Sequence, residues 1–143
     1  MIEVLIMDAS HWTRSALKEL IESDGSLRVV GLAKNAQEGL ALWRTFRPNL
    51  VVMDIRLSGM NNFDLVDSIM AEIPCPIVGL SDVPAGMDLD LRKCAERAGA
   101  LLVLDKPQLP INDVRKASQF LRNLRSMSEV RVVRRTRSRR PIS

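Results

Sequence analysis

Five short, almost continuous apolar runs alternate along the chain with longer segments in which apolar residues return every three or four positions. Continuous short runs are typical of strands buried on both faces, and the three-to-four spacing is typical of amphipathic helices. The runs predict strands over residues 2–7, 28–32, 50–55, 76–80 and 100–104. The helices are predicted between residues 10 and 24, between 35 and 48, and over 63–71, 88–98 and 112–124.

Residues that start and stop helices support these boundaries. Ser10 and Asn35 are candidate N-caps, and Gly99 is a candidate C-cap. A glycine and two asparagines predict a loop over residues 57–62. The apolar residues predicted to face inward are Leu89, Leu91, Cys94, Ala95 and Ala98 on the fourth helix, and Val114, Ala117, Phe120, Leu121 and Leu124 on the fifth.

Regular alternation of strand and helix predicts an α/β fold, with one doubly wound parallel sheet and helices on both of its faces. In such sheets, ligands bind beyond the carboxyl ends of the strands. Four polar residues stand at or just after those ends, namely Asp8, Asp54, Ser81 and Lys106. We therefore expect them to meet at one edge of the sheet.

Two carboxylates, a hydroxyl and a lysine form the set that a phosphoryl acceptor needs. One carboxylate attacks phosphorus, while a divalent cation, the lysine and the hydroxyl stabilise the phosphoryl oxygens. Magnesium accepts oxygen ligands and keeps several waters, so one or two carboxylates are enough to hold it.

The positive charge of the chain is concentrated at its end. The formal net charge is +4, but residues 126–143 hold six arginines and one acid, so the preceding residues carry −1. We interpret residues 1–125 as one domain and 126–143 as an unstructured, linker-like tail. Arginines within residues 131–140 could instead contact a nucleic acid or an anionic lipid.

Several classes of protein are disfavoured by what the sequence lacks. The cysteines, Cys75 and Cys94, form no CxxC pair and the one histidine is His11, so zinc is not expected. No apolar run is long enough to span a bilayer, and the acidic Glu3 is unlike the start of a signal peptide. We expect a cytoplasmic protein with reduced cysteines, no membrane contact and no DNA-binding domain.

Five stretches together resemble the receiver domain of bacterial two-component response regulators. They are residues 4–10, 51–55, 58–62, 76–81 and 99–107, and the likeness extends over residues 2–125. Residues 69–78 and 127–135 are most similar to the receiver half of chemotaxis-type protein-glutamate methylesterases. No glycine-rich nucleophile segment of the esterase follows, so we do not expect an enzyme. The resemblance implies the flavodoxin-like strand order 2-1-3-4-5.

The resemblance also implies a role for each polar residue. Asp54 would be the phosphoacceptor, and Asp8 would help to hold Mg²⁺, largely through water. The backbone carbonyl of Arg56 would be a metal ligand. Ser81 would contact a phosphoryl oxygen and act as a switch residue. Lys106 would pair with the acceptor or its phosphate, and its bond to the following proline is a candidate cis peptide.

Two positions depart from the family pattern. Ala9 stands where the family carries its second acid, so we expect magnesium binding to be weakened by roughly 10- to 100-fold. Val103 stands where many members carry a switching aromatic, so Ser81 lacks the usual partner for coupled movement.

Three functions follow as hypotheses. The first is a stand-alone receiver that accepts phosphate from a sensor histidine kinase or phosphotransfer protein and signals to a downstream protein by contact. The second is a degenerate receiver that binds a protein without being phosphorylated, as Ala9 and Val103 would favour. The third is a nucleic-acid binder that acts through the tail.

Overall fold

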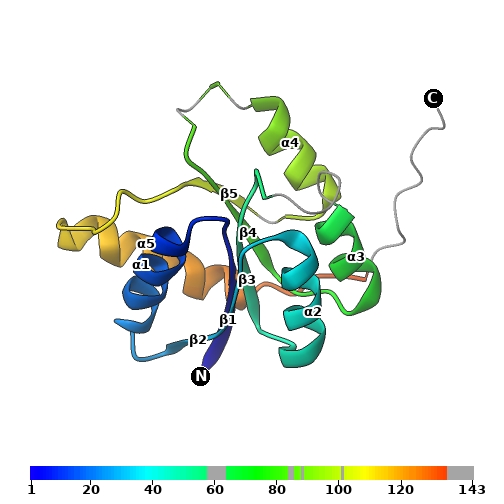
Figure 1. Cartoon of the computed structure of the whole chain (residues 1–143), viewed down its shortest axis with the longest axis horizontal. Helices are drawn as coiled ribbons and strands as arrows, with labels where there is room; N and C mark the ends of the chain where they lie inside the picture. The colour runs from blue at the N-terminus through cyan, green and yellow to red at the C-terminus, as the bar shows by residue number, and fades with distance from the viewer. Residues whose placement is uncertain (58–63, 84–85, 88, 101, 135–143) are drawn as a thin grey trace.

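The computed structural model describes residues 1–57, 64–83, 86–87, 89–100 and 102–134 of the chain. Their centre is a five-stranded parallel sheet of order β2-β1-β3-β4-β5 (Figure 1), which confirms the predicted fold and strand order. The strands are β1 (Ile2–Met7), β2 (Leu27–Ala33), β3 (Leu50–Asp54), β4 (Ile77–Ser81) and β5 (Leu102–Asp105). The helices are α1 (His11–Glu22), α2 (Ala36–Phe46), α3 (Asp64–Glu72), α4 (Leu89–Ala98) and α5 (Val114–Ser128).

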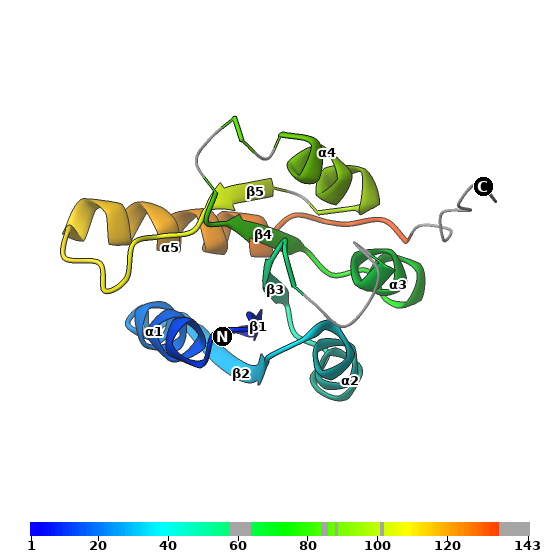
Figure 2. The ribbon, with the colours of Figure 1, turned by 45° about the horizontal axis from the view of Figure 1, so that its top comes forward.

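Helices cover both faces of the sheet. α1 and α5 lie on one side, while α2, α3 and α4 lie on the other (Figure 2). Successive residues of β1 belong to the two sides in turn, since Val4 and Ile6 pack with α1 and α5 whereas Leu5 and Met7 pack with α2 and α3. A parallel strand buried on both faces explains why its sequence is apolar without alternation.

The predicted helix caps are present. The side-chain oxygens of Ser10 and Asn35 accept hydrogen bonds from the first turns of α1 and α2. Gly99 ends α4 with a φ of 132°, which explains why a glycine is needed there. Asp113, which the sequence reading did not single out, caps α5 by accepting from the backbone N–H groups of Arg115 and Lys116.

Some residues predicted to face inward do not. Val114, the first residue of α5, is 78% exposed, and the buried residues of that helix begin only at Phe120. Leu89 is 54% exposed and Cys94 is also exposed, because α4 buries only Ala95 among its described residues. An apolar residue at helical spacing is therefore buried only where a neighbouring helix or strand packs against it.

Both cysteines are free thiols, as predicted, but their surroundings differ. Cys75 lies buried, with its Sγ 3.3 Å from the carbonyl oxygen of Pro48. Burial raises the pKa of the Cys75 thiol to about 12, so this side chain stays protonated at neutral pH.

The last helix and the packed segment after it extend beyond the domain boundary predicted at residue 125. α5 runs to Ser128, and the segment after it continues across the molecule toward α3 (Figure 2). There Val132 packs against the core on the α2–α3 side, and Arg134 Nε donates to the carbonyl oxygen of Ala71 at 2.7 Å. Whether residues 126–143 act as a linker stays a prediction, and residues 135–143 lie outside the described part.

Other sequence predictions also fall outside the described residues, namely those for the loop residues 58–62 and for Phe63, Asp88 and Leu101. Within the described part of the chain, no helix has the length and apolar character needed to cross a membrane.

Candidate functional site

The topology brings the carboxyl ends of four strands to one edge of the sheet. Asp8 follows β1 and Asp54 ends β3, and these neighbouring strands flank the point at which the strand order reverses. Ser81 ends β4, and Lys106 directly follows β5, with its backbone N–H donating to the carbonyl oxygen of Ser81 at 2.6 Å. Such a reversal point is where parallel α/β sheets bind ligands.

One lysine joins the two acids. Lys106 Nζ lies 2.8 Å from Asp8 Oδ2 and 3.1 Å from Asp54 Oδ2. The side chains are 12%, 3% and 14% exposed for Lys106, Asp8 and Asp54, so water screens these contacts little. Residues that are far apart in the sequence thus form a single, nearly buried cluster of charges.

Backbone groups hold the other oxygen of each acid. The N–H of Ser10 donates to Asp8 Oδ1 at 2.9 Å, and the N–H of Arg56 donates to Asp54 Oδ1 at 2.8 Å. All four carboxylate oxygens of the pair therefore accept a hydrogen bond. Both carboxylates are fixed in orientation, with one oxygen toward the main chain and the other toward Lys106.

The acids keep the lysine charged. Burial lowers the pKa of Lys106, but its hydrogen bonds to Asp8 and Asp54 raise it more, so the pKa lies above the ordinary value for lysine. The ammonium form is favoured, and with two ionised carboxylates the three side chains carry a net charge of about −1.

Ser81 and Val103 occupy the neighbouring strands. Ser81 is buried, and its Oγ accepts from the N–H of Val83 at 3.3 Å. Val103 is also buried and pairs in register with Gly79. Added to Gly79, a Cβ would lie 3.3 Å from Val103 Cγ2, so the valine packs directly over the glycine backbone. The switching roles expected at positions 81 and 103 stay predictions.

The side-chain contacts of two arginines at the site were not predicted from the sequence, although the backbone carbonyl of Arg56 was. Arg14 Nη1 donates to the carbonyl oxygens of Asp8 and Ala9, at 2.7 and 3.1 Å, and so fixes the turn that carries Asp8. The guanidinium of Arg56 lies 3.8 Å from Asp82 Oδ1, with both side chains more than half exposed. The sequence carried no signal for the contacts of Arg14, because its partners are backbone carbonyls rather than the side chain of an acid.

The cis peptide expected after Lys106 is wrong. The described chain has its cis bond at Leu109–Pro110, in the loop that leads to α5. Every bond before a proline has only a weak trans preference, so the sequence alone does not say which proline takes the cis form.

The donor set fits a weakly held magnesium ion. Asp8 and Asp54 offer two carboxylates from adjacent strands, which are oxygen ligands of the kind that Mg²⁺ takes when it keeps waters. The metal-binding role expected of the Arg56 carbonyl stays a prediction. Ala9 contributes only a methyl group where a further acid would add charge. In the described residues no three Asp, Glu, His or Cys side chains gather closely enough to hold a metal.

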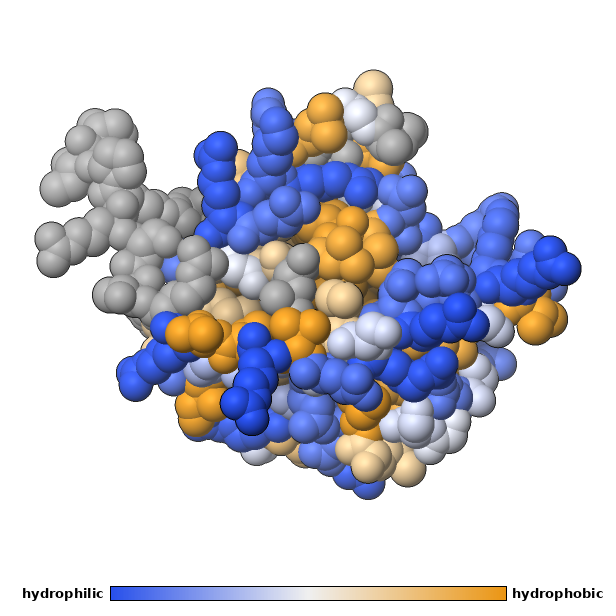
Figure 3. All heavy atoms as spheres, turned by 180° about the vertical axis from the view of Figure 1, so that it is seen from behind, coloured by the Kyte–Doolittle hydropathy of each residue, from blue (hydrophilic) through white to orange (hydrophobic). Residues whose placement is uncertain are grey.

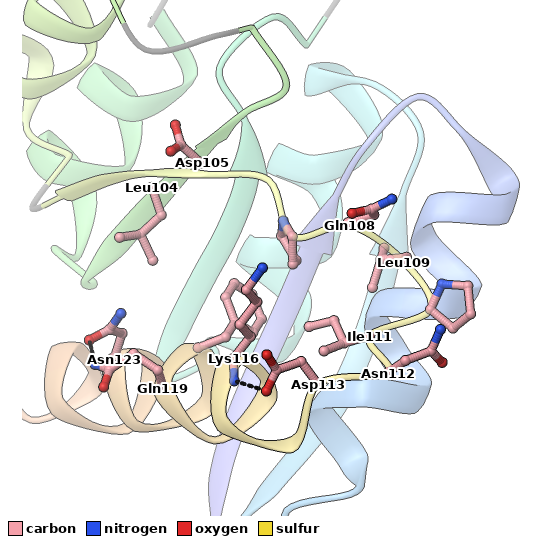
Figure 4. A pocket seen from close by; sticks show the side chains of 13 residues that line it. Leu104, Asp105, Gln108, Leu109, Ile111, Asn112, Asp113, Lys116, Gln119 and Asn123 are labelled. Carbon is pink, nitrogen blue, oxygen red and sulfur yellow. Dashed lines mark hydrogen bonds between the residues drawn. The ribbon is translucent and has the colours of Figure 1, made fainter.

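A cavity lies away from the charged cluster. It has a volume of about 730 Å³ and is bounded by the end of β5, the following loop and α5, with Leu104, Asp105, Lys116 and Phe120 among its walls (Figure 4). Neither Asp8 nor Asp54 lines it, so the charged cluster is a separate site.

On the side of the molecule opposite to Figure 1, hydrophobic surface is bordered by hydrophilic side chains (Figure 3).

Comparison with known proteins agrees with this arrangement. The family description "Response regulator receiver domain" matches residues 4–133. A protein-glutamate methylesterase/protein-glutamine glutaminase of Syntrophus aciditrophicus is 39% identical over 136 residues, which cover 94% of this chain and 39% of the relative. A similarly named protein of Myxococcus xanthus is 38% identical and is also covered over 38% of its length. The chain thus spans about two fifths of these relatives.

Solved structures show the same fold. The response regulator domain of Thermotoga maritima CheB superposes with a TM-score of 0.77 at 28% identity, covering 92% of this chain and 98% of that one. CheY6 of R. sphaeroides, solved in complex with the P1 domain of CheA3, is similar with a TM-score of 0.73 at 23% identity, covering 87% of this chain and 97% of the other.

Proposed function

Because the chain belongs to the response regulator receiver family, we propose that it accepts a phosphoryl group on Asp54 and passes that state to a partner by protein–protein contact. The donor is a phosphohistidine on a sensor histidine kinase or phosphotransfer protein. The observation that carries the proposal is the contact of Lys106 Nζ with both Asp8 and Asp54 at the point where the strand order reverses.

The transfer uses the oxygens and the amine already in place. Asp54 Oδ2 attacks phosphorus, an O–P bond forms, and the P–N bond to the donor histidine breaks. The electron pair of that bond stays on the imidazole nitrogen, which takes up a proton. Lys106 neutralises charge on the phosphoryl oxygens, and the hydroxyl of Ser81 donates to one of them. A bound Mg²⁺ would supply further neutralisation of those oxygens.

The acylphosphate adds about two negative charges to a nearly buried site. We expect Lys106 to exchange its contact with Asp54 for one with the phosphate, which shifts the segments after β4 and β5 between two arrangements. Since no catalytic step acts on an outside substrate, the receiver is a signalling module rather than an enzyme. The activity of the methylesterase relatives is not proposed for these residues.

A degenerate receiver is the second candidate, and Ala9 is the observation that favours it. With the neighbouring acid replaced by a methyl group, magnesium has fewer charged ligands, and phosphoryl transfer loses part of its charge neutralisation. Such a domain would bind its partner in one fixed state, with Asp8, Asp54 and Lys106 serving only to hold the edge of the sheet together.

Intact mass after incubation with a small-molecule phosphodonor and Mg²⁺ separates the two candidates. We expect the chain to gain the mass of one phosphoryl group, Asp54→Asn to gain none, and the control Asp90→Asn, on the exposed side of α4, to behave as the parent chain. If the parent gains no mass at saturating donor while Ala9→Asp does, the degenerate receiver is the correct description.

A further inference from the structure

Three segments that are distant in the sequence meet where α2 and α3 end, far from the charged cluster. Cys75 Sγ, in the turn after α3, lies 3.3 Å from the carbonyl oxygen of Pro48, in the turn after α2. Arg134 Nε, in the segment after α5, donates to the carbonyl oxygen of Ala71 at 2.7 Å. Residues 44–48, 71–75 and 129–134 therefore form one continuous surface, which we call the basic corner.

The basic corner carries more positive than negative charge. Its four arginines and two acids give a net charge of +2, and they are Arg44, Arg47, Arg131, Arg134, Glu72 and Glu129. Arg44 Nη2 pairs with Glu72 Oε1 at 2.6 Å. Among the described residues, the ion pairs include neither Arg47 nor Arg131. Arg47 is exposed, with its guanidinium 5.2 Å from the centre of the Trp43 ring. These charges are available to an anionic ligand.

Each segment of the basic corner also exposes an apolar side chain. Phe46, Ile73 and Val133 are 45%, 54% and 79% exposed. Val132 packs against the core, and successive side chains of an extended segment point in opposite directions, so Val133 is directed away from the core. Apolar side chains gathered among cations on a surface are typical of an interaction site rather than of ordinary solvated surface.

We propose that the basic corner binds the surface of an anionic lipid bilayer. Arginines are attracted to anionic headgroups, and apolar side chains beside them enter the boundary between headgroups and acyl chains. The phosphates of a nucleic acid would satisfy the arginines but would leave Ile73 and Val133 without an apolar partner. Four further arginines lie within residues 135–140 of the sequence, which adds positive charge directly after Arg134.

This contact is peripheral, so it requires no membrane-spanning helix, and it revises the expectation that the chain makes no membrane contact. Asp8, Asp54 and Lys106 lie at the opposite ends of the strands, where a phosphodonor could still approach a chain held on a bilayer. Lipid binding at the basic corner therefore does not rest on the phosphorylation of Asp54.

Cosedimentation of the chain with sucrose-loaded vesicles measures the contact. We expect the chain to bind vesicles of phosphatidylcholine and phosphatidylglycerol, to bind phosphatidylcholine alone weakly, and to dissociate as salt is raised. Arg47→Gln should weaken binding about fivefold, since one arginine near an anionic surface contributes about that factor. Ile73→Ser should weaken it by about the same factor while leaving the salt dependence unchanged, because it removes apolar contact only.

The matched control is Arg115→Gln, which removes the same charge from the first turn of α5, at the far side of the molecule from α3 (Figure 1). It should bind the vesicles as the parent chain does. Arg47 and Ile73 both lie outside the arginine-rich residues 131–140, so the two variants test the basic corner and not the arginine run alone. Circular dichroism shows whether each variant is folded, and Ile73→Ser decides the question if Arg47→Gln is not.

The inference is overturned if the parent chain does not bind the phosphatidylglycerol vesicles, or if the folded variants bind them as tightly as the parent. Tighter binding of the parent to duplex DNA than to these vesicles, with the same loss in Arg47→Gln, would also overturn it and would assign the basic corner to nucleic acid. None of these measurements requires a phosphodonor, so they succeed or fail separately from the proposed function.

Discussion

The two edges of the sheet carry the same kinds of charge in different surroundings. At the amino edge, Glu3 pairs with Arg28 across β1 and β2, and its side chain and that of the arginine are 34% and 58% exposed. At the carboxyl edge, Asp8 and Asp54 pair with Lys106, and all three side chains are less than 15% exposed. One edge is an ordinary solvated surface, whereas the other concentrates charge out of water.

The comparison shows that an ion pair alone does not distinguish a candidate functional site from ordinary surface. What distinguishes the carboxyl edge is the burial of its charged groups. Exposed pairs are screened and contribute little, while a nearly buried pair couples its members strongly. At the carboxyl edge the coupling keeps Lys106 protonated and orients both carboxylates. Those are the conditions that a phosphoryl acceptor needs, and nothing comparable surrounds Glu3.

The largest expected effect is that of removing the amine from the carboxyl edge. Lys106→Met should lower the free energy of unfolding by about 2–4 kcal/mol without metal, because two nearly buried carboxylates lose their counter-charge. Urea denaturation measures this loss. A change below about 0.5 kcal/mol would mean that the cluster is solvated like the amino edge.

An intermediate effect is expected just below the charged cluster. In Gly79→Ala the new Cβ would lie 2.6 Å from Ile55 Cγ2 and 3.3 Å from Val103 Cγ2. The crowding should cost about 1–3 kcal/mol of stability, since these side chains are buried and have little room to move. Thermal unfolding tests this. Unchanged stability of Gly79→Ala would show that β4 packs more loosely than described.

The smallest effect is expected at the amino edge. Arg28→Gln breaks the pair with Glu3 but should change the free energy of unfolding by less than about 1 kcal/mol, because both groups remain solvated. The same urea experiment applies at low and at high salt. A loss as large as that of Lys106→Met would remove the distinction between the two edges.

Much of the fold could be predicted because strands and helix ends each leave a local pattern in the sequence. Buried parallel strands must be apolar throughout, and helix caps such as Ser10 and Asn35 use local hydrogen bonds, so both leave clear patterns. Val114 and Leu89 were misplaced because helical spacing gives the face of a helix and not how far its neighbours extend. The ordered path of Val132 has no local signal, since its packing partners are distant in the sequence.

The candidate site could be located for a related reason. Chain topology alone sends the ends of β1, β3, β4 and β5 to one edge, so Asp8, Asp54 and Lys106 could be grouped without coordinates. The contacts of Arg14 could not, because long flexible side chains reach several partners. The sequence also does not tell which carboxylate oxygen of Asp8 and Asp54 accepts from a backbone N–H and which from the Lys106 amine. That choice depends on distances of a few tenths of an ångström.

Asp54 is the proposed acceptor of the phosphoryl group, and one experiment can identify the modified residue directly. Borohydride reduction of the phosphorylated chain, followed by peptide mass spectrometry, marks the acceptor because the acylphosphate is reduced and an ordinary carboxylate is not. We predict that the mark falls on Asp54 and is absent from Asp54→Asn. A mark on another residue of the unaltered chain, or one that persists in Asp54→Asn, would contradict it.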